Sequence, residues 1–130
     1  ISEILKVKSQ MDSGMFKPLQ LAAVQALAQR PEWFSELNAE YRRRRVLAGD
    51  IFDLLGAEYD RNSTGMFLWG KVNGKGVDVS DRLLYEAGVF ITPGFIFGKN
   101  GENHIRISLC AKPEVLKVAA ERIAAALAVG

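Results

Sequence analysis

The chain has 130 residues, with 17 Lys and Arg against 15 Asp and Glu and a formal net charge of +2. It is 48% hydrophobic and 25% charged, an ordinary globular composition that excludes a disordered chain, a collagen-like repeat and a coiled coil. The near balance of charge gives no indication of a nucleic-acid-binding surface. No apolar run approaches the ~20 residues that a membrane span needs.

The N-terminal part is predicted to be helical. Residues 1–8 carry apolar side chains at helical spacing and resemble the end of a helix. Residues 11–16 break this pattern around Gly14, which can adopt a positive φ. A second, Ala-rich helix is predicted over 19–29 and a third, longer one over 31–55, where a proline opens it.

The long helix has an interrupted apolar stripe. The stripe consists of Phe34, Leu37, Tyr41, Ala48, Ile51 and Leu55. Four arginines separate its two halves: Arg42, Arg43, Arg44 and Arg45. Four consecutive helical residues fan around most of the circumference, so they cannot form one phosphate-binding patch. We interpret them as mostly solvated side chains lying along the helix. Such an interrupted stripe is typical of a helix that joins two bodies.

After Gly56 the pattern changes to short strands. Strands are predicted at 57–60, 66–72, 89–91 and 104–110, a short helix at 81–87 capped by Asp78 or Ser80, and a final amphipathic helix at 113–129. In the last strand Ile105, Ile107 and Leu109 alternate with polar residues, which predicts one apolar and one polar face. Three helices followed by β-β-α-β-β-α indicate an α+β fold, with a small mixed sheet and helices packed on one face.

Two glycine-rich segments do not fit phosphate-binding loops. Residues 70–76 lack the Ser or Thr and the immediate helix start of a P-loop, so we interpret them as a hairpin turn. Gly94, Gly98 and Gly101 have the wrong spacing for a dinucleotide fingerprint and lead into a strand. Neither segment therefore predicts a nucleotide site.

Reactive side chains are few. Cys110 is the one cysteine and His104 the one histidine, which excludes an internal disulfide and a zinc site, and no metal is expected. We interpret Cys110 as a small core residue, His104 as an exposed or hydrogen-bonded one, and the pair Asp50 and Asp53 as a solvated helix face. The cysteine usage favours a reducing, cytoplasmic setting. The chain starts at Ile1 with no targeting peptide, and we expect a further segment before it.

Arg106 differs from these residues. It lies between Ile105 and Ile107, so its side chain should point away from the core, and a Pro-Gly-Phe-Ile-Phe-Gly loop precedes the strand. A guanidinium is planar and always charged, and it can hold a carboxylate with two parallel hydrogen bonds. By itself an arginine on the solvent-exposed face of a strand usually contributes little.

Five short segments together resemble a known family. They are Gln20 to Leu27, Tyr41-Arg42-x-Arg44-Arg45, Gly65-Met66-Phe67-Leu68-Trp69, Gly88-Val89 with Pro93-Gly94-x-x-Phe97-Gly98, and Arg106-Ile107-Ser108. In this order and with these gaps they resemble the C-terminal part of the class I/II aminotransferases, the fold type I pyridoxal-phosphate enzymes. The segment 9–18 is similar to the branch with the diaminopimelate, alanine and methionine aminotransferases.

The resemblance implies an organisation and a reaction. Residues 1–30 would be the tail of the large domain (helix, interface loop, helix), 31–56 the interdomain helix, and 57–130 the small C-terminal α+β domain. The full-length protein would be a homodimer that uses pyridoxal 5'-phosphate to move an amino group between an amino acid and a 2-oxo acid. Arg106 would bind the substrate carboxylate, and the loop at 9–16 would lie near the dimer interface.

The chain also departs from the pattern of the family it resembles. The resemblance places the Schiff-base lysine and most cofactor contacts in a large domain before Ile1, and the lysines at positions 8, 17, 71, 75 and 99 do not stand in that context. We therefore expect no catalytic residue in this chain, assign no cofactor-binding residue, and expect the fragment alone to be inactive. The alternative is a free-standing α+β module that binds an acidic ligand or peptide through the face around Arg106.

Overall fold

A computed structural model describes residues 1–11 and 14–129 of the chain. The backbone divides into two compact units, Ile1–Leu37 and Asn38–Gly130, and the division falls within the long helix α3 (Pro31–Leu54). Two residues of the expected interface loop, Asp12 and Ser13, lie outside the described residues. Within the described ranges no helix is long and apolar enough to cross a membrane.

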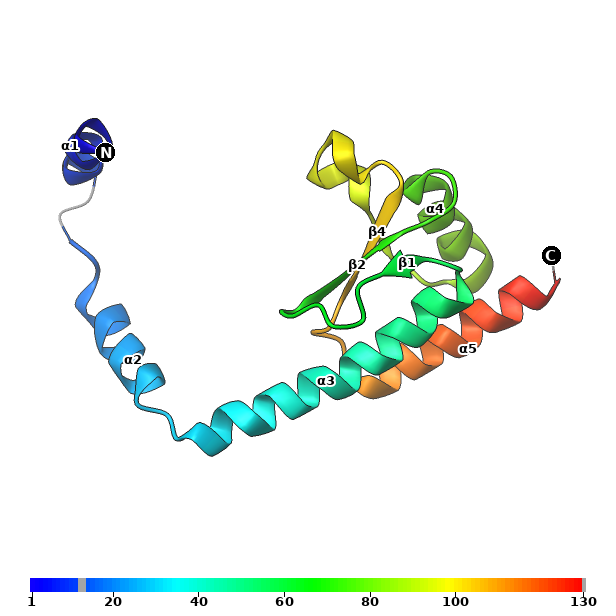
Figure 1. Cartoon of the computed structure of the whole chain (residues 1–130), viewed down its shortest axis with the longest axis horizontal. Helices are drawn as coiled ribbons and strands as arrows, with labels where there is room; N and C mark the ends of the chain where they lie inside the picture. Colours follow the sequence, from blue (N-terminus) through cyan, green and yellow to red (C-terminus); the bar gives the residue numbers. More distant parts are fainter. Residues whose placement is uncertain (12–13, 130) are drawn as a thin grey trace. The chain divides into compact units, whose positions relative to one another are not determined.

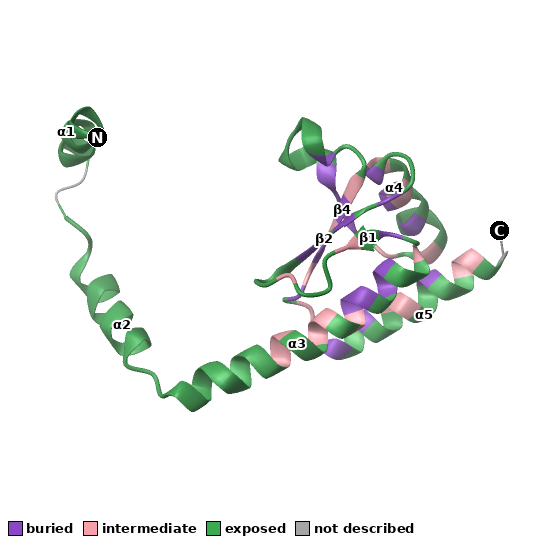
Figure 2. Cartoon of the chain, in the orientation of Figure 1, coloured by how far each residue is buried: buried purple, intermediate pink, exposed green. Residues whose placement is uncertain are grey.

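The first unit is helical, as predicted. It contains α1 (Ser2–Met11), α2 (Lys17–Leu27) and the beginning of α3. Pro18 lies in the first turn of α2, where its missing N–H costs no hydrogen bond. None of the described side chains of α1 and α2 is buried, and both helices are coloured as exposed in Figure 2.

The second unit is built around a four-stranded sheet (Figure 1). Its strands are β1 (Glu58–Tyr59), β2 (Phe67–Lys71), β3 (Thr92–Pro93) and β4 (His104–Ser108), in the order β1-β2-β4-β3. The α+β class is confirmed, but every strand pair is antiparallel, so the expected mixed pairing is wrong. β2 and β3 do run in the same direction, yet β4 inserts between them and separates the parallel strands.

Helices cover one face of this sheet. The second half of α3, together with α4 (Gly76–Ala87) and α5 (Pro113–Val129), packs on the sheet and contributes to a single core. That core contains Ala48, Ile51, Phe52, Ala57, Leu68, Val72, Leu83, Ile91, Ile105, Ile107, Leu109, Leu116 and Ile123. Gly70 lies under the Phe52 ring, where an added Cβ would come within 2.7 Å of ring carbon Cε2. The sheet residues on the opposite face are therefore left for other contacts.

The start of α4 differs from its prediction. The helix begins at Gly76, five residues before the expected start, and neither Asp78 nor Ser80 caps it. The Gly76 amide donates to the carbonyl oxygen of Glu102 at 2.8 Å, and the carbonyl of His104 occupies the space that a Cβ would need. Residues 70–76 thus connect a strand to a helix and do not form the predicted hairpin turn. A tertiary contact sets this boundary, which local sequence cannot indicate.

The predicted strand at 89–91 is also wrong. The pairing with β4 occurs one residue later, at Thr92 and Pro93. The amide of Val89 donates to the carbonyl of Leu83 at 3.1 Å and closes the end of α4, and the carbonyl of Ile91 accepts a hydrogen bond from the Ser80 hydroxyl. The hydrogen-bonding groups of this segment are therefore used by α4. Two short 3₁₀ turns, η1 (Gly94–Phe97) and η2 (Lys99–Gly101), then lead to β4.

Candidate functional site

Arg106 projects from the face of the sheet that the helices leave uncovered. It pairs with Trp69 on β2 and with Thr92 on β3, while its chain neighbours Ile105 and Ile107 are buried in the core. The alternation that the sequence predicted for this strand is confirmed by the burial pattern of β4. The position of the Arg106 side chain follows directly from the two-residue period of a strand.

Two phenylalanine rings hold the Arg106 guanidinium. Its central carbon, Cζ, lies 4.2 Å from the ring centroid of Phe67 and 3.9 Å from that of Phe97. Phe67 belongs to β2 and Phe97 to η1, so two separate elements supply the rings. A cation within about 6 Å of an aromatic face is attracted by the ring quadrupole. The two rings therefore favour one placement of this charge.

The N–H groups of the guanidinium have no hydrogen-bond partner in the described part of the chain. Among the described residues no carbonyl or carboxylate accepts a hydrogen bond from Arg106 and none forms an ion pair with it. An arginine in this state can hold a carboxylate or phosphate with two parallel hydrogen bonds. The arrangement is therefore suited to binding an anion.

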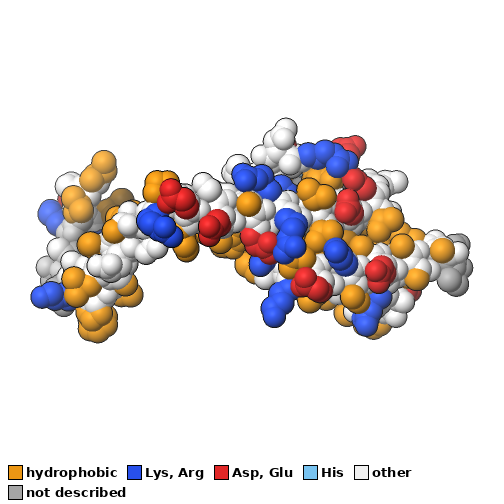
Figure 3. Space-filling model, turned by 90° about the horizontal axis from the view of Figure 1, so that it is seen from below, with side chains coloured by type: hydrophobic (Ala, Val, Ile, Leu, Met, Phe, Trp, Pro, Cys, Tyr) orange, Lys and Arg blue, Asp and Glu red, His pale blue; other side chains and the backbone are white. Residues whose placement is uncertain are grey.

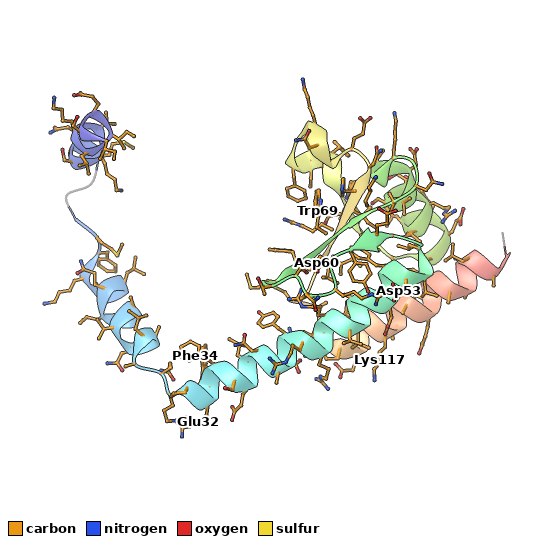
Figure 4. The ribbon with its side chains drawn as sticks, viewed as in Figure 1. Glu32, Phe34, Asp53, Asp60, Trp69 and Lys117 are labelled. Carbon is orange, nitrogen blue, oxygen red and sulfur yellow. The ribbon has the colours of Figure 1, made fainter. Side chains whose placement is uncertain are left out.

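Trp69 supports Phe97, one of the two rings that lie against Arg106. Its indole makes an edge contact with Phe97 at 5.8 Å between centroids and stacks on His104 at 5.1 Å. The glycines of the neighbouring turns press against it, because a Cβ on Gly94 would lie 2.8 Å from Cη2 of Trp69 and one on Gly101 would lie 3.2 Å away. Trp69 is labelled in Figure 4, beside the 3₁₀ turns.

His104 has a structural position. The expected exposed or hydrogen-bonded side chain is half-buried, and its Nδ1 is buried without a hydrogen-bond partner among the described residues. Its ring lies nearly parallel to that of Trp69, with an angle of 15° between their planes. The side chain is therefore packed by stacking and is neither exposed nor hydrogen-bonded through Nδ1 to a described residue.

The arginine run on α3 divides into two pairs. Arg42 and Arg43 are exposed, as predicted, but Arg44 and Arg45 are half-buried and bind backbone carbonyls. Arg44 Nη1 donates to the oxygen of Leu109 at 3.0 Å, and Arg45 Nη2 donates to that of Gly65 at 2.7 Å. The interpretation of all four as solvated side chains is therefore wrong for this second pair.

Ion pairs account for part of the charged surface of α3. The hydrogen bond from Arg44, at 2.8 Å, lowers the pKa of Glu40 below its usual value of 4.5. At the other end of the helix Asp53 accepts a hydrogen bond from Arg61 at 2.7 Å, so it is more than a solvated helix residue. Figure 3 shows Lys and Arg side chains interspersed with Asp and Glu on the face in view.

The other candidate residues are not gathered at Arg106. Cys110 is exposed, which corrects its interpretation as a core residue, because the β4 alternation ends one residue before it, at buried Leu109. All lysines of the chain are exposed. A lysine that forms a Schiff base is activated by a desolvated pocket or by a neighbouring cation. None of these lysines has a desolvated setting, and the residues present do not fit the aldehyde of a pyridoxal cofactor.

An apolar groove adjoins the site on the β3 side. It has a volume of about 590 Å³, and Phe90, Thr92, Arg106 and Val118 are among its lining residues. The groove borders the outer side of β4 beyond the short strand β3, which pairs only with Ile105 and Arg106. Arg106 thus lies between this groove and the two phenylalanine rings.

The second unit is thus a small α+β domain that presents an arginine beside two phenylalanine rings on the uncovered face of its sheet. The Aminotransferase class I and II profile matches residues 1–123. The chain belongs to the class I and II aminotransferase family, which confirms the resemblance seen in the sequence.

Individual relatives give the same assignment. The chain is 37% identical over 125 residues to the LL-diaminopimelate aminotransferase of Natranaerobius thermophilus, covering 95% of this chain and 32% of that protein. It is 38% identical to the enzyme of the same name from Aquifex aeolicus, over 91% of this chain and 31% of the relative. The structure of apo-BacF from Bacillus subtilis matches 92% of this chain and 33% of its own, with 32% identity and a TM-score of 0.76. The chain thus spans about a third of the length of these relatives.

Sequence reasoning missed the two rings at Arg106 and two structural arginines outside the site. Phe67 and Phe97 stand in family-like segments, but nothing in their spacing shows that both rings meet Arg106. Arg44 and Arg45 belong to an arginine run, but their carbonyl partners lie 65 and 20 residues away in the sequence. A turn rich in glycine and aromatics before the Arg106 strand was the one local signal.

Proposed function

We propose that this chain is the substrate-binding, C-terminal part of a pyridoxal-phosphate-dependent aminotransferase. Residues 1–30 would belong to the tail of a large domain, 31–56 to the interdomain helix and 57–130 to the small domain. Family membership and the length of the relatives support this assignment. The full-length protein would act as a homodimer on an amino acid and a 2-oxo acid.

In this proposal Arg106 binds the α-carboxylate of the substrate. The observation that carries the proposal is the guanidinium against two rings, with no hydrogen-bond acceptor for it among the described residues. A forked hydrogen bond fixes both the position and the rotation of a carboxylate, so the bonds at the neighbouring α-carbon are held in one orientation. Arg106 thus contributes binding and orientation and transfers no proton itself.

Pyridoxal phosphate would supply the aldehyde that accepts the amino group and the electron-withdrawing ring conjugated to it. The exposed lysines described above do not fit this group, so the cofactor would be bound mainly by residues outside this chain. We therefore assign to these residues only the recognition of the substrate carboxylate. The names of the relatives from Natranaerobius thermophilus and Aquifex aeolicus make LL-diaminopimelate the first substrate to test.

The test is Arg106→Lys in the full-length protein. Lysine keeps the charge but cannot make the fork, so kcat/KM for the best amino acid substrate should fall by roughly 10- to 100-fold. Arg82→Lys is the matched control, because Arg82 is an exposed arginine on α4 of the same unit, and its kcat/KM should stay within about twofold. An unchanged kcat/KM in Arg106→Lys would contradict the proposed role.

A free-standing binding module is the competing possibility. It requires that a gene product of this length binds a carboxylate or acidic peptide without transferring an amino group. Transamination by a product that contains a further ~250 residues with a cofactor-binding lysine would exclude it. A parent reading frame that encodes no such domain would instead favour the module.

A further inference from the structure

Two phenylalanine rings from separate elements lie against the Arg106 guanidinium. Phe67 lies 4.2 Å from Cζ and Phe97 lies 3.9 Å from it, measured to the ring centroids. Phe67 pairs with Ser108, two residues along β4 from Arg106, so it reaches the guanidinium diagonally across the two strands. Phe97 reaches it from η1, which is outside the sheet.

We infer that Phe67 and Phe97 are positioning residues that hold Arg106 ready for a carboxylate. This inference rests on the carboxylate-binding role proposed for Arg106. A free arginine side chain has many rotamers, and ordering it on ligand binding costs affinity. Two rings from separate elements restrict the guanidinium before the ligand arrives. No hydrogen bond from Arg106 to a described residue has to break when a carboxylate binds.

The two rings are fixed in different ways. Phe67 is part of the central strand β2, so the sheet itself sets its position. Phe97 depends on the 3₁₀ turns, whose glycines pack on Trp69. A Cβ on Gly101 would collide with the carbonyl oxygen of Gly94, so this packing requires both glycines. Trp69 then meets the edge of Phe97, which keeps that ring over Arg106.

This arrangement predicts that a third phenylalanine nearby contributes little to substrate binding. Phe95 belongs to the same turn as Phe97 and is exposed to a similar degree, 49% against 48%. Among the described residues only Phe67 and Phe97 place a ring over the Arg106 guanidinium. Phe95→Leu is therefore a matched control for Phe97→Leu, since both remove one ring from η1.

The experiment measures steady-state kinetics of the full-length protein loaded with pyridoxal phosphate. The probe is whichever of LL-diaminopimelate and the twenty amino acids gives the wild-type protein its highest kcat/KM. We expect Phe97→Leu and Phe67→Leu each to lower kcat/KM by roughly 3- to 30-fold, mainly through KM, because a cation–ring contact contributes to substrate binding. Phe97→Tyr, which keeps the ring, should stay within about threefold of the wild type, and Phe95→Leu within about twofold.

A double-mutant cycle separates positioning from general structural damage. In an Arg106→Gln background no cation remains to be positioned, so Phe97→Leu should have little further effect on kcat/KM. An equal effect in both backgrounds, or no effect of either leucine variant in the wild type, would overturn the inference. If Arg106→Gln leaves kcat/KM unchanged, or no probe is transaminated, the proposed function fails instead. Thermal melts of each variant show whether the fold is retained.

Discussion

Nη1 of Arg44 donates to the carbonyl oxygen of Leu109 at 3.0 Å and joins α3 to the segment that follows β4. The same side chain binds Glu40 through Nε at 2.8 Å. Arg44 thus binds both a carboxylate on the same helix and a backbone carbonyl 65 residues away in the sequence. Through this contact the end of the strand that carries Arg106 is fixed to the long helix.

The contact predicts that Arg44 stabilises the second unit. Arg44→Met keeps much of the apolar stem but removes the donors, and it should cost about 1–3 kcal/mol, as for a hydrogen bond from a charged group. The measurement is the Tm of the full-length protein by calorimetry. Arg43→Met is the control, because Arg43 is exposed and Glu40 is its one partner among the residues that the structure describes; its Tm should change little. Equal shifts in the two variants would contradict the role given to Arg44.

The pKa of Glu40 gives this region a pH dependence of defined sign. The hydrogen bond from Arg44 favours the ionised carboxylate, so the folded-state pKa lies below the usual 4.5. The stabilisation is therefore fully present above pH 4.5 and is lost as the pH falls through the lowered folded-state pKa. The Tm difference between the wild type and Glu40→Gln should be largest near neutrality and shrink in acid. A difference that grows as the pH falls below 4.5 would show the opposite linkage.

The regular elements could be predicted from the sequence because their signals are local. Pro113 at the start of α5 and the alternation of Ile105 and Ile107 in β4 are read within a few residues, and both elements are confirmed. The start of α4 could not be predicted, because it depends on contacts of Gly76 with Glu102 and His104, which lie far along the chain. β1 pairs over two residues, Glu58 and Tyr59, out of the four predicted, and β3 at Thr92–Pro93 lies beyond the predicted 89–91.

The candidate site shows the same division. The outward direction of Arg106 follows from strand period alone, so it could be predicted. Its two aromatic neighbours arise from sheet register and from the path of η1, which a single sequence does not encode at any local spacing. The arginine run on α3 shows what a local pattern leaves open. The helical period predicts that the four side chains point in different directions, but it does not predict which carbonyls they bind.

Ser80 predicts a further stabilising contact inside the second unit. It is 1% exposed, and its hydroxyl donates to the carbonyl oxygen of Ile91 at 2.5 Å. Ser80→Ala would leave that buried acceptor without a partner, which costs about 1–3 kcal/mol and should lower the Tm. Ser35→Ala is the matched control, because the Ser35 hydroxyl also binds a backbone carbonyl but on an exposed part of α3. A Tm decrease for Ser35→Ala as large as that for Ser80→Ala would contradict the importance of burial.

The glycine contact against Trp69 predicts the behaviour of Gly101→Ala. The added methyl group would meet the carbonyl of Gly94 and the indole, so the two 3₁₀ turns must move apart. Overpacking of this kind costs about 1–3 kcal/mol, and a change in tryptophan fluorescence should accompany it. Asn100→Ala, an exposed substitution in the same turn, should leave both the Tm and the spectrum unchanged. An unaltered spectrum in Gly101→Ala would contradict close packing of this segment on Trp69.

The exposed lysines predict that the 130-residue chain alone neither binds pyridoxal phosphate tightly nor transfers amino groups. An exposed amine lacks the desolvation that activates a lysine toward an aldehyde. Titration with the cofactor, followed by absorbance, should give weak and unsaturated changes. Incubation with LL-diaminopimelate and 2-oxoglutarate should form no glutamate. The full-length protein under the same conditions is the control and should bind the cofactor at stoichiometric concentration. Glutamate formation by the chain alone would show that it contains catalytic residues of its own.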